Sequence, residues 1–187
     1  MSYLDKISSK EKEHNGKKIL LLGLTQSGKT SIIKTFFEGM TPEDTESLDA
    51  TIKFESNSYG FNDHKIQVYD VGGQIVYLEE AIEKNKERIF TDVKSLIFVI
   101  ELPNMSTYEL SRQYLLRILK NVYLYSDNPE TYVFAHKIDL ISKEYRDEAV
   151  RVFKKYFAIE EVKKIKVFQT SIYESTSKKA LKEILEN

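Results

Sequence analysis

The chain has 187 residues, of which 41% are hydrophobic and 30% are charged, a composition that supports a folded core and excludes a disordered chain. Lys and Arg number 28 and Asp and Glu number 29, so the net charge of -1 excludes a general basic surface for nucleic acid. The absence of cysteine excludes disulfides, thiolate metal sites, a cysteine nucleophile, and prenyl or palmitoyl anchors.

No apolar run approaches the ~18 residues of a membrane span. Met1 to Lys18 is polar and lacks a signal-peptide core, and Ser2 stands where N-myristoylation needs glycine. We therefore expect a cytoplasmic protein with a polar N-terminal leader at 1–17, no direct lipid anchor, and membrane recruitment only through partners.

Four short apolar runs, at 18–22, 95–100, 132–135 and 165–168, are typical of strands buried on both faces of a parallel sheet. Helical periodicity separates the later runs at 115–122 and 145–156, and a terminal helix is predicted at 180–185. Over the second of these segments the expected buried face consists of Tyr145, Ala149, Val152, Phe153 and Tyr156.

A period of two appears at Ile52 and Phe54 and again at Ile66 and Val68, which predicts two half-buried strands. Turn-forming residues at 59–63 lie between them. We therefore expect an antiparallel hairpin at one edge of an otherwise parallel sheet, within a single α/β domain at 18–187.

The segment at 23–30 matches the phosphate-loop pattern G-x-x-x-x-G-K-[ST]. Its glycines let backbone N–H groups point at phosphate oxygens, and the following helix presents its N-terminus to the anion. Lys29 would reach the β- and γ-phosphates, and the Thr30 hydroxyl would ligate Mg²⁺.

The strand pattern and this motif together predict an α/β fold of the P-loop NTPase class. We expect a three-layer sandwich around a mostly parallel six-stranded sheet with one antiparallel edge strand. The residues expected to contact phosphate are Gly23, Thr25, Gln26, Ser27, Gly28, Lys29, Thr30 and Ser31.

A second motif, Asp70-Val-Gly-Gly73-Gln74, follows the second hairpin strand. Asp70 at a strand end can hold Mg²⁺ through water, the Gly73 N–H can meet a γ-phosphate, and Gln74 can orient an attacking water. Thr51, before the first hairpin strand, is the favoured further metal ligand over Thr41 and Thr45. The apolar stretch 75–78 after Gln74 is open to two interpretations, core packing or a partner-binding surface exposed in one nucleotide state.

His136-Lys137-Ile-Asp139 follows the strand at 132–135, at the sheet edge where open α/β sheets bind ligands. The Asp139 carboxylate can accept from guanine N1–H and N2–H together, a donor pair that adenine lacks. The Lys137 stem can cover a base face. Ser171 and Ile172, after the last strand, form a second loop that can close over the base, although Ser171 is also a plausible helix N-cap.

The order of these motifs resembles a Ras-superfamily small GTPase over 18–187. Three details resemble the Rag (Gtr) family in particular: His136 where most small GTPases have Asn, the segment 170–175, and Leu48-Asp-Ala-Thr51-Ile. Rag proteins carry a C-terminal roadblock domain through which they heterodimerise, whereas this sequence ends after the helix at 180–186. We therefore expect a stand-alone Rag-like G domain, and an Arf-like GTPase is the weaker resemblance because Arf proteins use Asn-Lys-x-Asp.

These features predict a molecular switch that binds GTP or GDP with Mg²⁺ and hydrolyses GTP slowly, with Gln74, Lys29 and Gly73 as catalytic residues. The alternatives are a pseudo-GTPase fixed in one nucleotide state, and a P-loop kinase or ATPase. The resemblance implies regulatory and effector proteins at the switch loops, with a roadblock-type protein or a second GTPase among them. The nearly neutral charge argues against a nucleic-acid partner.

Overall fold

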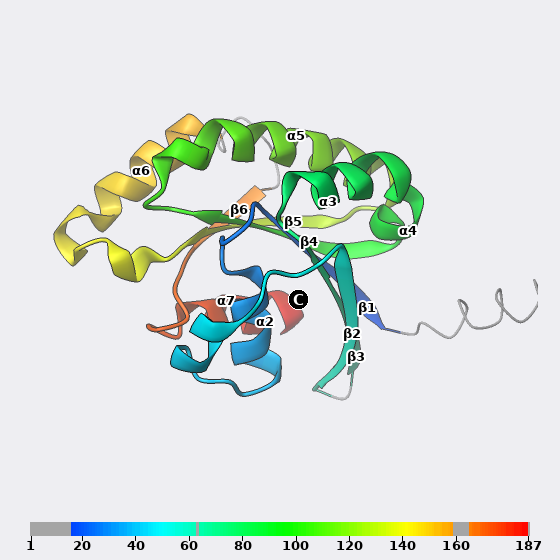
Figure 1. The fold of residues 1–187 in the computed structure, drawn as a ribbon, viewed down its shortest axis with the longest axis horizontal. Coiled ribbons are helices and arrows are strands. Elements are labelled where there is room, and N and C mark those ends of the chain that lie inside the picture. The colour runs from blue at the N-terminus through cyan, green and yellow to red at the C-terminus, as the bar shows by residue number, and fades with distance from the viewer. Residues whose placement is uncertain (1–15, 63, 159–164, 187) are drawn as a thin grey trace, which may run out of the picture.

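The computed structural model describes residues 16–62, 64–158 and 165–186, and its centre is a twisted six-stranded sheet (Figure 1). The strand order is β2-β3-β1-β4-β5-β6. Every neighbouring pair is parallel except β2 and β3. The predicted sheet with one antiparallel edge strand is therefore confirmed. The strands are β1 (Lys17–Leu22), β2 (Phe54–Phe61), β3 (His64–Val71), β4 (Val93–Glu101), β5 (Glu130–His136) and β6 (Ile165–Thr170).

Helices cover both faces of this sheet. Figure 1 shows α2 (Lys29–Phe37) and α7 (Thr176–Glu186) on one face, and the remaining α-helices on the other. Those are α3 (Ile75–Glu79), α4 (Lys86–Phe90), α5 (Tyr108–Tyr125) and α6 (Arg146–Tyr156). A π-helical turn at Glu80–Lys84 joins α3 to α4, and 3-10 turns lie at η1 (Glu43–Ser47), η3 (Met105–Thr107), η4 (Ile138–Leu140) and η5 (Lys143–Tyr145).

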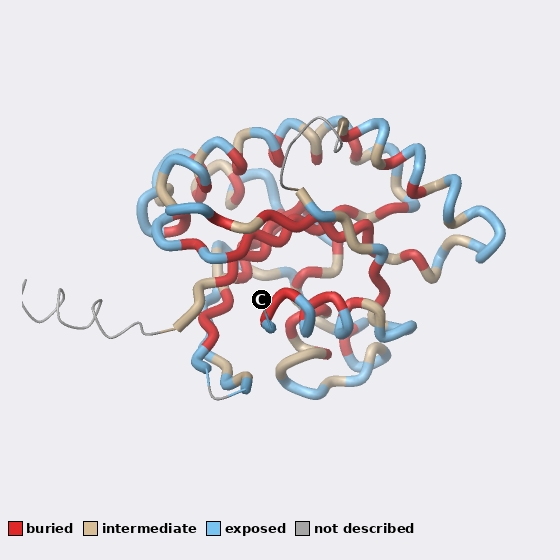
Figure 2. The backbone as a smooth tube through the Cα atoms, turned by 180° about the vertical axis from the view of Figure 1, so that it is seen from behind, coloured by how far each residue is buried: buried red, intermediate tan, exposed pale blue. Residues whose placement is uncertain are grey.

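The central strands β1, β4 and β5 are apolar at consecutive positions because each of them packs against helices on both faces. In β1, Leu20 and Leu22 join the core under α3 to α6, whereas Ile19 and Leu21 join the core under α2 and α7. Figure 2 shows the buried strands as a continuous central band. The alternation explains why these runs show no polar face.

Strand order reverses direction around β1, since the chain adds β3 and β2 on one side and β4, β5 and β6 on the other. In open parallel sheets, ligands bind beyond the carboxyl ends of the strands at such a switch point. The segment that follows Leu22 therefore occupies the position where this fold binds ligands.

The predicted buried face of the helix at 145–156 is wrong in part. Its helix begins at Arg146, and its buried stripe is Val150 and Phe153, continued by Phe157. Tyr145, Val152 and Tyr156 are exposed. Phe153 and Phe157 determine the orientation because their rings pack against Tyr108 of α5, at centroid distances of 5.6 and 5.3 Å.

Three expected boundaries also differ. β2 begins at Phe54, so Ile52 precedes the strand and is 69% exposed. The strands extend to Phe61 and from His64, so the hairpin turn is tighter than the predicted 59–63. β6 continues through Thr170, which we expected in the following loop, because Thr170 pairs with His136 of β5.

The segment 75–90 forms α3, the π-helical turn and α4, a helical region that the sequence patterns do not predict. Leu78, Ala81, Ile82 and Ile89 are buried in the core under α5. Ile75 and Val76 are 52% and 62% exposed, so the stretch 75–78 is split between core packing and free surface.

The predicted leader at 1–17 lies almost wholly outside the described residues, and Lys17 is the first residue of β1. Among the residues that the structure describes, none of the helices is both long and apolar enough to span a bilayer.

Candidate functional site

The phosphate loop connects the carboxyl end of β1 to the first turn of α2. Gly23 and Gly28 have φ angles of +148° and +96°. A β-carbon on Gly23 would lie 2.2 Å from the carbonyl oxygen of Val99, so only glycine fits there. The buried ammonium of Lys29 donates to the carbonyl oxygen of Leu24 at 3.1 Å. Burial lowers the pKa of Lys29 to about 8, an effect that the charge of Asp70 opposes.

The three predicted metal ligands converge from three separate segments. The Thr30 hydroxyl donates to Asp70 Oδ2 at 2.5 Å, and the Thr51 hydroxyl donates to the same oxygen at 3.2 Å. The two hydroxyl oxygens lie 2.9 Å apart. Of the three candidate threonines, Thr51 contacts Asp70, whereas Thr41 bonds to Asp44 and Thr45 bonds to the carbonyl of Pro42.

This cluster fits a Mg²⁺ ion held partly by water. Asp70 is buried, and its Oδ1 atom has no hydrogen-bond partner within the described residues. Burial raises the pKa of Asp70, while the bonds from Thr30 and Thr51 and the charge of Lys29 lower it. One carboxylate and two hydroxyls suit Mg²⁺, which retains several waters. The described part of the chain contains no group of three His, Cys, Asp or Glu side chains suited to a metal, so this cluster of one carboxylate and two hydroxyls is of a different kind.

Gly73 packs directly on the phosphate loop. A β-carbon on Gly73 would stand 2.3 Å from the carbonyl carbon of Leu24 and 2.4 Å from the nitrogen of Thr25. Gln74 follows as the exposed residue before α3. The Gly72 N–H donates to the carbonyl of Lys53 at 2.8 Å, so the two segments that carry Thr51 and Gln74 are joined by a backbone bond.

The predicted base-binding residues gather beyond the ends of β5 and β6. The buried His136 imidazole has Nδ1 2.9 Å from the Thr170 hydroxyl. Burial lowers the pKa of His136 to about 4, so the ring is neutral at pH 7. Lys137 has a φ of +61°, and its ammonium donates to Glu101 Oε1 of β4 at 3.0 Å. This ion pair holds the Lys137 side chain, which lines the cavity that Asp139 also lines.

Two adjoining cavities connect these groups. One, of about 400 Å³, is lined by phosphate-loop residues together with Thr51, Gly73 and Gln74. The other, of about 300 Å³, is lined by Asp139 and Ile172, among others. Both are also lined by Gly28, Ser31, Thr45, Glu46 and Lys137, so they form one elongated cleft. Ser171 is buried beside the second cavity and organises its loop, with its Oγ accepting from two backbone N–H groups.

Sequence reasoning missed three residues at this cleft. Glu46 and Tyr173 line its wall, and Glu101 holds Lys137. Glu101 directly follows the strand predicted at 95–100, and Tyr173 directly follows the predicted base loop at 171–172, so proximity to a predicted element was the available signal. Glu46 lies in an acidic segment without periodicity, and nothing in the sequence marked it.

A phosphate loop at the switch point, a hydroxyl and carboxylate cluster beside it and a second pocket beyond β5 and β6 define a P-loop protein of the small-GTPase fold. The structure is similar to that of the Arl6 BBS3 small GTPase of Trypanosoma brucei with a bound GppNp analogue, at a TM-score of 0.70 and 17% identity. The match covers 91% of this chain and 96% of that one.

The family model described as the Gtr1/RagA G protein conserved region matches residues 18–187, and the chain belongs to this family. It is 32% identical over 143 residues to the GTP-binding protein GTR1 of Saccharomyces cerevisiae, covering 76% of this chain and 46% of that protein. It is 28% identical over 173 residues to the Ras-related GTP-binding protein A of Dictyostelium discoideum, covering 90% and 56%. The chain thus spans about half the length of these relatives.

Proposed function

We propose that this chain is a Rag-type molecular switch that binds GTP and GDP with Mg²⁺ and hydrolyses GTP slowly. The observation that carries the proposal is the convergence of Thr30, Thr51 and Asp70 at one end of a cleft whose other end holds Asp139. A purine nucleotide bound with Mg²⁺ requires a metal and phosphate site and a base site in one continuous cleft, and the two ends of this cleft meet these two requirements.

At the base end, the Asp139 carboxylate selects guanine, since it accepts from N1–H and N2–H together. Asp139 is half-buried, and the adjoining Lys137 is held by Glu101. Ile172 and the Lys137 stem supply apolar surface for the faces of the base.

At the phosphate end, the chain supplies positioning and charge rather than a covalent nucleophile. Lys29 and the loop amides bind the β- and γ-phosphates, and a bound Mg²⁺ would neutralise negative charge on them. Gln74 is exposed at the cleft and orients the attacking water.

A slow rate is consistent with Thr25, an exposed branched residue that lines the same cavity as Gln74 and crowds the pose in which Gln74 orients water. The polar segment 39–51 contains no arginine to supply a stabilising charge from within the chain. The intrinsic rate should therefore lie below roughly 10⁻² s⁻¹.

The two segments that respond to the γ-phosphate are coupled by the backbone hydrogen bond between Gly72 and Lys53. Contact of the γ-phosphate with Thr51 and Gly73 holds both segments, and loss of that phosphate releases them together. The side chains of Ile52, Ile75 and Val76 flank these segments and are exposed, so regulatory and effector proteins can bind them in one nucleotide state.

The partners belong to one of two classes, a roadblock-type protein or a second GTPase. The protein acts in the cytoplasm and is recruited to membranes through such partners.

Two measurements test this function. The nucleotide released when the purified protein is denatured should be GDP or GTP, and an adenine nucleotide would favour the kinase or ATPase alternative. Single-turnover hydrolysis of bound GTP should be slow but measurable. No hydrolysis even with activating proteins present would favour the pseudo-GTPase alternative.

A further inference from the structure

A hydrogen bond crosses the mouth of the base pocket between residues that are 127 positions apart in the sequence. The Tyr173 hydroxyl donates to Glu46 Oε1 at 2.7 Å. Tyr173 follows the base loop at the end of β6, whereas Glu46 belongs to η1, in the polar segment that leads to Thr51. Both residues line the base end of the cleft, and Glu46 also lines the phosphate end.

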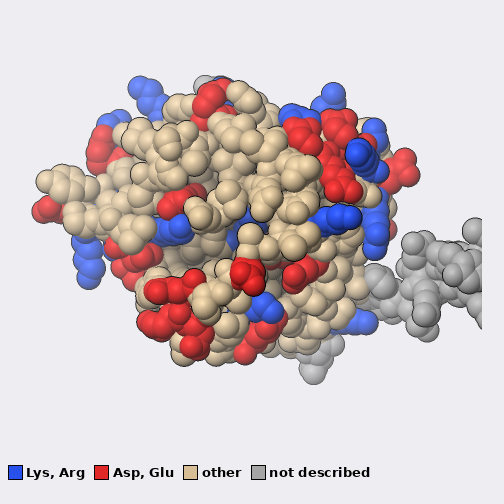
Figure 3. Space-filling view, in the orientation of Figure 1, with Lys and Arg blue, Asp and Glu red and all other residues tan. Residues whose placement is uncertain are grey.

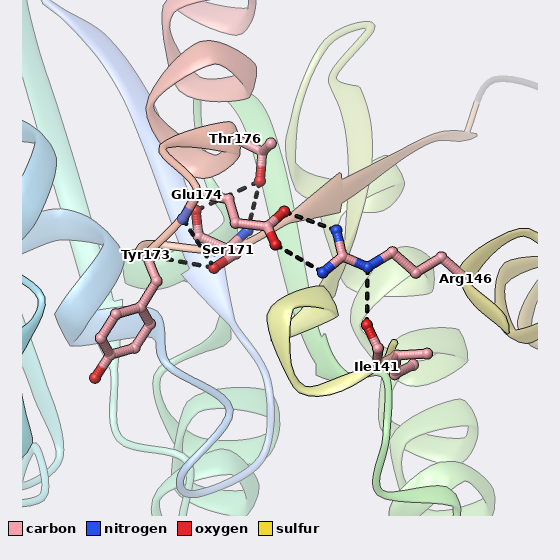
Figure 4. Close-up of polar contacts among 6 residues, drawn as sticks. All are labelled: Ile141, Arg146, Ser171, Tyr173, Glu174 and Thr176. Atoms are coloured by element: carbon pink, nitrogen blue, oxygen red, sulfur yellow. Dashed lines mark hydrogen bonds and ion pairs between the residues drawn. The ribbon is translucent and has the colours of Figure 1, made fainter. Parts of the chain in front are cut away.

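The Tyr173 side of this contact is rigidly built (Figure 4). The Ser171 hydroxyl oxygen accepts from the Tyr173 N–H at 3.1 Å, and the Ser171 N–H donates to the Thr176 hydroxyl at 2.7 Å. Arg146 then pairs through two bonds with Glu174, at 2.6 and 2.8 Å, and donates through Nε to the carbonyl of Ile141. The loop carrying Tyr173 is thus tied to the segment just after Asp139.

The Glu46 side is connected along the chain to the metal cluster. The segment 39–53 contains a single short 3-10 turn, and its internal bonds are local, such as those between Thr41 and Asp44. Its end carries Thr51, which contacts Thr30 and Asp70. Glu46 therefore lies only five residues before Thr51, the residue of this segment that contacts the metal cluster.

The charges around Tyr173 favour a donating hydroxyl. Figure 3 shows acidic side chains gathered over η1, which carries Glu43, Asp44 and Glu46. The hydrogen bond to Glu46 is the largest influence on the Tyr173 hydroxyl and raises its pKa to about 12. Tyr173 therefore stays protonated, and Glu46 accepts a charge-assisted hydrogen bond.

We propose that Tyr173 and Glu46 form a latch across the base pocket that slows guanine-nucleotide release and links it to the position of Thr51. This inference rests on the proposed function, and it adds that Tyr173 and Glu46 hold the base end of the cleft closed. A nucleotide lying beneath η1 leaves only after this bond breaks. Withdrawal of Thr51 from the metal cluster pulls Glu46 away from Tyr173 and opens the same exit.

The test measures release of fluorescent N-methylanthraniloyl-GDP into excess unlabelled GDP with Mg²⁺. Tyr173→Phe removes only the hydroxyl, and Glu46→Ala removes the acceptor. Both side chains are exposed, so neither change removes core packing. Each variant should release nucleotide about threefold to tenfold faster than the parent, as expected for losing one charge-assisted hydrogen bond. The double variant should release no faster than the faster single variant, because both remove the same bond.

Glu43→Ala is the matched control, since it removes the same charge from the same turn without touching Tyr173. Tyr145→Phe, at an exposed tyrosine outside the cleft, controls for hydroxyl loss. Unchanged release in Tyr173→Phe and Glu46→Ala, fully multiplicative effects in the double variant, or an equal effect of Glu43→Ala would each overturn the latch while leaving the proposed function standing. A parent protein that fails to bind the labelled GDP would overturn the proposed function and the latch with it.

Discussion

The His136 imidazole lies against the backbone of Gly28, so the carboxyl end of β5 and the phosphate loop are in direct contact. A β-carbon on Gly28 would stand 2.7 Å from His136 Cδ2 and 2.8 Å from Nε2. The other side of the ring is fixed by Thr170. The two ends of the cleft are therefore held at a set separation by one buried side chain.

This contact predicts that Gly28→Ala lowers affinity for guanine nucleotide at least about tenfold and lowers the free energy of unfolding by about 1–3 kcal/mol. The alanine must displace His136 and also adopt a φ of +96°. Nucleotide titration and urea unfolding measure the two effects.

Gly39→Ala is the control, because Gly39 has a φ of +72° but an added β-carbon there meets no atom within 4 Å. It should cost only about 1 kcal/mol of backbone strain and leave affinity unchanged. Equal loss of affinity in both variants would show that backbone strain, and not the His136 contact, is responsible.

The low pKa of His136 predicts a pH dependence of stability. Burial is the main cause, Lys137 adds to it, and Asp139 and the bond to Thr170 oppose it. The unfolded chain takes up a proton near pH 6.5, whereas the folded chain does so only near pH 4, so the free energy of unfolding falls as pH decreases through this window. Relative to pH 7.5, the loss from this residue is about 2 kcal/mol at pH 5.

Urea unfolding of the parent and of His136→Asn over pH 5 to 7.5 measures this loss, because asparagine does not titrate and all other groups are shared. The parent should lose stability more steeply than the variant as pH falls. Parallel pH profiles would contradict a buried neutral imidazole.

Arg146 ties the loop that carries Glu174 to the segment after Asp139. Glu174→Ala breaks this connection and should therefore accelerate nucleotide release by about twofold to fivefold. Glu148→Ala breaks a similar ion pair with Arg151 on the same helix, but that pair is exposed and remote from the cleft. It should leave release unchanged. Equal rates of nucleotide release in the two variants would show that the Arg146–Glu174 pair does not slow release.

The account of hydrolysis predicts that Gln74→Leu slows single-turnover GTP hydrolysis by about tenfold or more while leaving GTP affinity little changed. Thr25→Gly should raise the rate, because it removes the branched side chain beside Gln74. Fast hydrolysis by the parent alone, or no loss of rate in Gln74→Leu, would contradict this account.

The features that the sequence predicted are those coded locally. The apolar run at 18–22 is buried on both faces and reads as a strand without knowledge of its neighbours. The glycine spacing at 23–28 reflects backbone angles that other residues adopt poorly. Motifs at strand ends could then be placed together, because the carboxyl ends of parallel strands meet at one edge.

The features that escaped prediction depend on distant contacts. The buried stripe of α6 is decided by Tyr108, and the apolar positions of 145–156 allowed a rotated alternative. Glu46 meets Tyr173 only because two unrelated loops close over the same cleft. Neither partner carries a pattern that points to the other.

In the proposed function, the cleft binds a guanine base at Asp139 and the phosphates of the nucleotide at Lys29 and Thr30. The most direct test compares binding of GDP and xanthosine diphosphate to the parent and to Asp139→Asn. The parent should prefer GDP, and Asp139→Asn should weaken GDP binding by about 1–3 kcal/mol while gaining affinity for the xanthine nucleotide, whose extra oxygen accepts from the new amide. A variant that binds GDP as tightly as the parent would contradict the account, because the base would then lie elsewhere.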